Sequence, residues 1–93
     1  MNDGEVTRLE ELAEALIDDH DRLREALVGR RKAQRLTQAE VGERMGVSQP
    51  AVANFERYDA NPTLSSVRRY ALAVGARIET NVSDDGRWAR SVR

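Results

Sequence analysis

The sequence contains no cysteine, only two prolines, and few aromatic residues, which make up 4% of its 93 residues. Without cysteine, disulfide frameworks, thiolate zinc sites and thiol nucleophiles are excluded. A core with so few aromatic rings must be built from Ala, Val, Leu and Ile, which favours short packed helices over a β-sandwich or barrel. Apolar runs end after a few residues, well short of the roughly 20 that span a membrane. We therefore expect a cytoplasmic protein with no membrane association.

Signatures of catalysis and metal binding are missing as well. His20 is the only histidine and has no second nitrogen or sulfur ligand near it, so we expect a surface or capping histidine and no metal site. The sequence also lacks a glycine-rich phosphate loop and any nucleophile motif. These absences predict a protein that is not an enzyme and holds no cofactor.

The formal net charge of -1 argues against a nucleic-acid partner, but the charges are unevenly distributed along the chain. Residues 1–21 hold eight acidic residues against Arg8 alone, a net charge of -7. Residues 22–57 carry +4, and the remaining 36 residues carry +2. A near-neutral total can thus hide a basic working face beside an acidic appendage. The alternative is that both charged segments are ordinary solvated helix faces, and the distribution of charge by itself favours this alternative.

The first third of the chain has a helical pattern of apolar residues. The pattern predicts an amphipathic helix over residues 5–17, with apolar positions Val6, Leu9, Leu12, Ala13, Leu16 and Ile17. The polar cluster at residues 18–21 interrupts this pattern and has the composition of a cap for a second helix. Whether the helix breaks there is left open by the sequence.

Two short helices with a tight turn between them are predicted next. Thr37 and Glu40 have the spacing of a capping box, and Gly46 is placed to end the helix that they begin, over about residues 38–45. Ser48 can cap the following helix, where Pro50 falls in the first turn. Val52 and Phe55 are predicted to form the buried face of that helix.

In the last third of the chain, a helical pattern of apolar residues is followed by a segment in which apolar and polar residues alternate. Thr63 is placed to cap a helix that runs to Gly75, with apolar positions Leu64, Val67, Ala71 and Val74. The alternation of Ile78, Thr80 and Val82 with polar residues then predicts a half-buried strand. Residues 87–93 either return as a second strand, with Trp88 and Val92 on one face, or form a basic tail.

Residues 37–56, TQAEVGERMGVSQPAVANFE, closely resemble the helix-turn-helix of the Cro/Xre family, which includes lambda-type phage repressors and many bacterial regulators. The matching residues are Thr37, Gln38, Val41, Met45, Gly46, Val47, Ser48, Gln49, Val52, Phe55 and Glu56. The resemblance covers about residues 23–75, and it departs from the family pattern at Arg35, Gly42 and Tyr58, where Gly, Ala and Gly are usual.

The length of the chain predicts a single domain over residues 1–93, and the resemblance implies a mainly α fold. Within it we expect a lambda-repressor-like helix-turn-helix bundle over residues 22–75. An extra acidic N-terminal helix occupies residues 1–21, and a C-terminal β-strand or hairpin, which can serve in dimerisation, occupies residues 76–93. The resemblance also implies a structural ion pair between Arg31 and Glu56, so these two residues are expected to belong to the scaffold.

The resemblance further implies that the second helix of the motif enters the major groove of DNA. Its outward residues, expected at base edges, are Gln49, Pro50, Ala53 and Asn54. The amides of Gln49 and Asn54 can pair with adenine, whereas Pro50 and Ala53 suit a thymine methyl group. Contacts to the DNA backbone are expected from Gln38, Ser48, Arg44, Arg57, Lys32 and Arg35. Arg30 is a further candidate, and for Arg30 and Arg44 a solvated surface position is equally compatible with the sequence.

Together these features predict a sequence-specific transcriptional regulator, a repressor that binds a palindromic double-stranded DNA operator as a homodimer. The dimer surface is either the strand at residues 78–82 or the stripe formed by Leu9, Leu12 and Leu16, and core packing is at least as good an explanation of both. The alternative function is an antitoxin. Such a protein binds a protein partner, here through the acidic N-terminal helix, and represses its own promoter.

Overall fold

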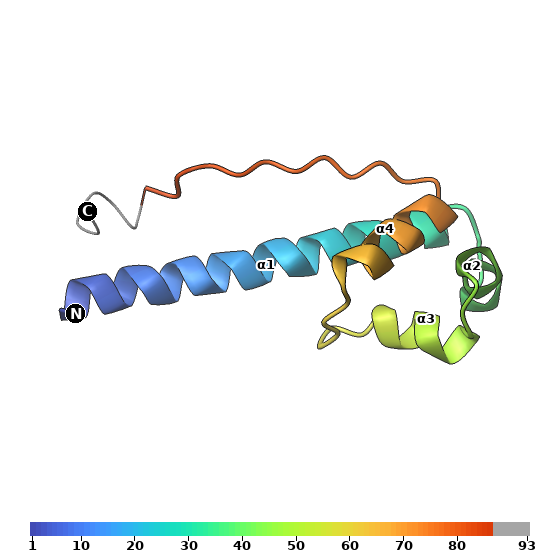
Figure 1. The fold of residues 1–93 in the computed structure, drawn as a ribbon, viewed down its shortest axis with the longest axis horizontal. Helices are drawn as coiled ribbons and strands as arrows, with labels where there is room; N and C mark the ends of the chain where they lie inside the picture. The colour runs from blue at the N-terminus through green and yellow to red at the C-terminus, as the bar shows by residue number, and fades with distance from the viewer. Residues whose placement is uncertain (87–93) are drawn as a thin grey trace.

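A computed structural model of the chain describes residues 1–86, in which four helices and no strand are found. The helices are α1 (Asp3–Ala33), α2 (Gln38–Met45), α3 (Gln49–Phe55) and α4 (Leu64–Ala73). Figure 1 shows α2, α3 and α4 gathered at the C-terminal half of α1, while its N-terminal half projects beyond them. The radius of gyration is accordingly 16.8 Å, against about 12 Å for a compact domain of this length. We call the projecting residues 3–19 the arm.

The helix α1 is continuous through residues 18–21, which settles the question that the sequence left open. Asp21 is paired with Arg24 one turn later, at 3.0 Å, and Nε2 of His20 lies 3.2 Å from the carbonyl oxygen of Ala60 in the loop before α4. Because the side chains of Asp21 and His20 bond to the next turn of the helix and to the loop, they do not cap a new helix. The arm is therefore a rigid extension of the helix that carries the bundle.

The predicted caps of the three shorter helices are confirmed. The hydroxyl of Thr37 accepts a hydrogen bond from the backbone N–H of Glu40 at 3.0 Å, and the Glu40 carboxylate accepts one from the N–H of Thr37 at 3.1 Å. Ser48 and Thr63 cap α3 and α4 in the same way. Local sequence signals thus decide where each of these helices begins.

The turn between α2 and α3 depends on two glycines. Gly46 ends α2 with a φ of 73°, in the left-handed region that L side chains rarely adopt. Gly42 is buried against the turn, and a Cβ atom at this position would lie 2.8 Å from the carbonyl oxygen of Val47. The absence of a side chain at Gly42, where the family usually has Ala, lets the turn approach α2 closely.

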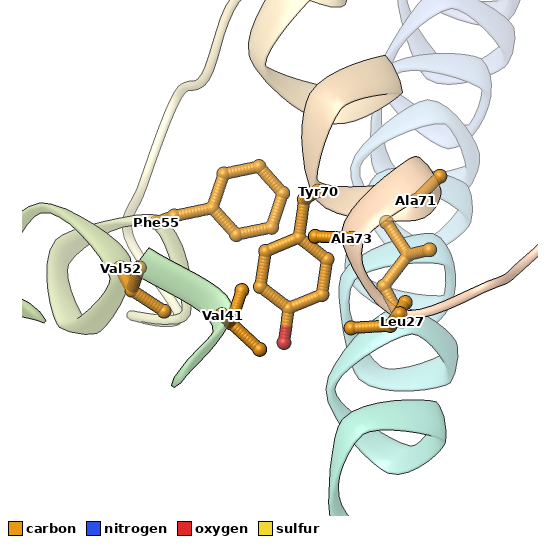
Figure 2. Packing of buried hydrophobic residues seen from close by; sticks show 8 residues of the cluster. Leu27, Val41, Val52, Phe55, Tyr70, Ala71 and Ala73 are labelled. Atoms are coloured by element: carbon orange, nitrogen blue, oxygen red, sulfur yellow. The ribbon is translucent and has the colours of Figure 1, made fainter. Parts of the chain in front are cut away.

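Eight residues from all four helices and the end of α4 form the core (Figure 2). They are Leu27, Val41, Val52, Phe55, Tyr70, Ala71, Ala73 and Val74. The rings of Phe55 and Tyr70 are stacked, with centroids 4.4 Å apart and planes inclined by 10°. This contact fixes α3 against α4 and buries apolar area that small side chains alone would not supply.

One expectation for the C-terminal third of the chain is wrong. The strand expected around Ile78, Thr80 and Val82 does not form within residues 76–86, which have no strand to pair with. Ile78 packs against the core, whereas Val82 is 97% exposed. In α4 the face that packs on the core is centred on Val67 and Tyr70, and Leu64, one of the apolar positions named for this helix, is 76% exposed. The second strand or tail expected at residues 87–93 lies outside the described residues.

The junction between α1 and α2 holds an arginine in a conformation that favours glycine. Arg35 has a φ of 58°, and its N–H bonds the carbonyl of Lys32 at 3.0 Å. The N–H of Leu36 bonds the carbonyl of Arg31 at 3.2 Å, which completes a Schellman motif. The family usually has Gly at this position, and the chain keeps the same turn at the cost of a strained side chain.

We predict that Arg35→Gly raises the free energy of unfolding by about 0.5 to 1 kcal/mol, because relief of left-handed strain exceeds the added entropy of the unfolded chain. Ala33→Gly, two residues earlier in regular helix, should lower it by about 0.5 to 1 kcal/mol. Urea unfolding followed by circular dichroism measures both. A loss of stability in Arg35→Gly would contradict the assigned turn.

Candidate nucleic-acid interface

The helix α3 buries one face and exposes the other. Val52 and Phe55 are buried, as predicted. The exposed residues of the helix are Gln49, Pro50, Ala51 and Asn54. Ala53, expected at a base edge, is half-buried, and Ala51, which sequence reasoning missed, is open to solvent. Three of the four residues predicted for base contact therefore share an accessible surface, with Ala53 partly withdrawn from it.

The first residues of α2 and α3 are joined by their side chains. The amide Nε2 of Gln49 donates a hydrogen bond to Oε1 of Gln38 at 2.6 Å, and Nε2 of Gln38 donates to Oε1 of Glu56 at 3.1 Å. An amide has two N–H donors, so Gln49 keeps one N–H and its Oε1 for another partner. These two groups are the pair that bidentate contact with an adenine base requires. Sequence reasoning selected both glutamines but did not foresee the bond between them.

Glu56, at the end of α3, is held by groups from the three other helices. Arg31 binds it through two hydrogen bonds, from Nε at 2.7 Å and Nη2 at 2.9 Å. The hydroxyl of Tyr70 donates to Oε2 of the same carboxylate at 2.7 Å, and Gln38 is its fourth donor. The side chains of Arg31 and Glu56 are only 12% and 9% exposed, and the ion pair implied by the family resemblance is confirmed.

The environment of this cluster keeps the ion pair charged. Burial acts to raise the pKa of Glu56, but hydrogen bonds from Arg31, Tyr70 and Gln38 outweigh it, so that pKa is lowered from its ordinary value. The hydrogen bond with Glu56 raises the pKa of Arg31. Burial, together with the bond to Glu56, raises the pKa of Tyr70, which therefore remains a neutral donor at physiological pH.

The cations expected at the DNA backbone divide into two groups. Nη1 of Arg44 donates a hydrogen bond to the carbonyl oxygen of Ala73 at 2.8 Å. Arg57 forms a bidentate ion pair with Asp59, in which Nε lies 3.0 Å from Oδ1 and Nη2 lies 2.8 Å from Oδ2. Lys32 and Arg35 are exposed, and their side chains have no ion pair with any residue that the structure describes. The latter two are thus the cations most available to a phosphate. The Ser48 hydroxyl serves as the cap of α3.

Residues 1–86 contain no candidate metal site and no helix that could span a membrane. No group of three or more His, Cys, Asp or Glu side chains is placed there to hold a metal ion. None of the four helices combines the length and the hydrophobicity that crossing a membrane requires. His20 is half-buried against the loop before α4 rather than at the surface.

Comparison with known proteins gives one family and two curated relatives. The sequence model of the family described as helix-turn-helix matches residues 30–80. Two proteins of Mycobacterium tuberculosis, from strains CDC 1551 / Oshkosh and ATCC 25618 / H37Rv and both named Antitoxin HigA1, are each 49% identical over 57 residues. The match covers 61% of this chain and 38% of each relative, so the chain spans about two fifths of their length. No solved structure matches the chain significantly.

We predict that Glu56→Gln lowers the free energy of unfolding by about 2 to 3 kcal/mol near neutral pH, because it leaves Arg31 without its counter-charge. The pKa of Glu56 is depressed in the folded state, so its contribution is present above the ordinary value of 4.5 and is lost as the pH falls through the folded value. The difference between wild type and Glu56→Gln should therefore shrink in acid.

Denaturant unfolding at a series of pH values measures this difference. Glu43→Gln, on the exposed surface of α2, is the matched control and should change stability by less than about 0.5 kcal/mol. An equal effect of the two substitutions would contradict the structural role given to Glu56.

Proposed function

The chain belongs to the helix-turn-helix family, and from this membership we propose that it is a sequence-specific double-stranded DNA-binding transcriptional regulator, which acts as a repressor in the bacterial cytoplasm. The single observation that carries the proposal is the side-chain bond between Gln38 and Gln49 at the starts of α2 and α3. Family membership and the relatives favour a regulator over an enzyme.

In this proposal α3 lies in the major groove and reads base edges. Gln49 donates one N–H to Gln38 and presents its remaining N–H and Oε1 to adenine, so its orientation is set before DNA binds. Asn54, five residues later, is exposed and provides a second amide. Pro50 and Ala53 supply apolar contacts suited to a thymine methyl group, with Ala53 the less accessible of the two.

Contacts to the sugar-phosphate backbone position α3 in the groove. We propose Lys32 and Arg35 as the main cationic contacts, with Gln38 and Ser48 as neutral ones. Arg44 and Arg57 contribute less, because Arg44 is bonded to the end of α4 and Arg57 is neutralised by Asp59. One α3 helix covers few base pairs, so we propose a homodimer on a palindromic operator with half-sites about 34 Å apart or a multiple of that distance.

An antitoxin role is the second candidate function, and two observations favour it. The two curated relatives are both named Antitoxin HigA1. The projecting arm belongs to a segment with a net charge of -7, which suits a basic protein partner. Co-purification with a small basic protein encoded beside this chain, lost on deletion of residues 1–19, would support it. Retention of that protein by the truncated chain would contradict a role for the arm.

We predict that Gln49→Ala and Asn54→Ala each weaken operator binding by about 1 to 3 kcal/mol and relax base preference at one or two positions. Selection from a random DNA pool, performed with wild type and both variants, measures this preference and also tests palindromy and half-site spacing. Asn81→Ala, an exposed amide after α4, is the matched control and should change nothing. Failure of the wild type to enrich any sequence would overturn the proposed function.

We predict that Lys32→Ala reduces the slope of log affinity against log salt by about one unit per subunit, and so by about two units for the proposed homodimer, and weakens binding equally across sequences. Arg57→Ala should reduce the slope by clearly less, because the charge of Arg57 is already offset by Asp59. Fluorescence anisotropy titrations at several salt concentrations give both slopes. Equal reductions in the two variants would show that the ion pair opens on DNA.

A further inference from the structure

The two ends of α1 carry opposite charge. Residues 3–21 hold eight acidic residues and one arginine, whereas residues 22–33 hold five basic residues and one acidic residue. Because the helix is continuous over 31 residues, these halves lie along one rod about 46 Å long. The family match begins at residue 30, so the arm lies outside it.

An apolar seam runs along the same rod. Leu9, Leu16 and Leu23 recur every seven residues, and Leu12 and Ala26 occupy the positions three residues after two of them. In the arm this seam is open: Leu16 is 60% exposed, and Leu9 and Leu12 are only partly covered. A continuous helix cannot fold back on itself, and residues 79–86 are exposed rather than packed on the seam. Within residues 1–86 the arm's seam is therefore left open to another molecule.

A groove lies at the other end of α1. It has a volume of about 490 Å³ and is formed between the C-terminal half of α1 and residues 75–79. Its apolar lining includes Leu23, Ala26, Leu27 and Ile78. Arg30, Arg77 and Glu79 line it as well, and Arg77 is paired with Glu79 at 3.7 Å. The apolar lining and the charge of Arg30, which has no ion pair within the described residues, complement the apolar and acidic arm.

We propose that the arm of a second copy of this chain occupies this groove, and that the two α1 helices pack antiparallel so that each copy fills the groove of the other. This deepens the homodimer of the proposed function and rests on it. In the register that follows from the seam, Leu12 lies opposite Leu23 of the second copy, Leu9 opposite Ala26, and Glu5 opposite Arg30. The same contact then covers the arm's seam and the groove in both copies. It is isologous, so it gives a closed dimer with two-fold symmetry.

Charge selects this arrangement over the other ways in which two α1 helices can pack. A parallel pair, or a pair overlapping only through the arms, would bring two segments of net charge -6 together. The antiparallel pair instead places each arm beside a basic half-helix. Asp19 is the one acidic residue in the seam, where this register places it opposite Leu16 of the second copy, and Arg22 at 3.6 Å offsets its charge.

Cysteine pairing tests the register directly, since the chain has no cysteine of its own. Leu12→Cys combined with Leu23→Cys should give a covalent dimer on mild oxidation. The two positions are eleven residues apart on one helix, about 16 Å, so a disulfide within one chain is impossible. Glu10→Cys combined with Glu25→Cys has the same register on the outer face and is the matched control. Equal cross-linking of the control, or of Leu12→Cys alone, would overturn the antiparallel seam.

Charge reversal gives a second test that needs no cysteine. Glu5→Arg and Arg30→Glu each create like-charge contacts in both halves of a homodimer, so each should raise the dimer dissociation constant by about tenfold. A mixture of the two variants forms a heterodimer in which both contacts are again between opposite charges, and its affinity should return to within about threefold of wild type. Analytical ultracentrifugation measures the dimer dissociation constants of the two variants and of their mixture. Absence of recovery in the mixture would overturn the proposal.

The outcomes separate this proposal from the proposed function. Binding to a duplex with a single half-site depends on α3 and not on the dimer contact. If that duplex binds and neither cross-link nor recovery is seen, the interface is wrong and the function stands. If the cross-link forms and no DNA binds, the interface stands and the function is wrong.

Discussion

The ion pair between Arg31 and Glu56 connects all four helices, and the candidate DNA-binding surface depends on it. Arg31 belongs to α1, Glu56 caps α3, and the same carboxylate accepts hydrogen bonds from Gln38 of α2 and Tyr70 of α4. A carboxylate with four donors and little exposure is satisfied only in one arrangement of the helices. The angle between α2 and α3, and with it the place of Gln49, follows from this constraint.

The same helix that anchors the ion pair also extends far beyond the bundle. Its C-terminal half contributes Leu27 to the core and Arg31 to the polar cluster, while its N-terminal half is an acidic arm with an exposed apolar seam. The near-neutral net charge of the chain is thus the sum of two surfaces with opposite character. A single helix holds the arm at a fixed position relative to α3, so under the proposed function contacts made by the arm would constrain how α3 meets DNA.

Local signals were sufficient for the helix boundaries in the middle of the chain. Thr37, Ser48 and Thr63 cap the helices that the sequence predicted, because each cap is satisfied within three residues. Local signals were not sufficient where the decision lay elsewhere in the fold. The sequence left open whether the helix breaks at residues 18–21, and the structure keeps it continuous, with His20 bonded to the loop before α4. The strand predicted after Gly75 is absent, because it has no partner strand within residues 76–86.

The sequence by itself determined the helix-turn-helix, its caps and its buried face, because these depend on spacing within one or two turns. Only the tertiary structure decided which of the candidate DNA-contact side chains are already bonded to other residues of the protein. Gln38 and Gln49 are bonded to each other, Arg44 is tied to α4 and Arg57 is paired with Asp59, whereas Lys32 and Arg35 remain exposed. The physical reason is that most of these partnerships join residues from different helices, and their distances are set by the packing of the core.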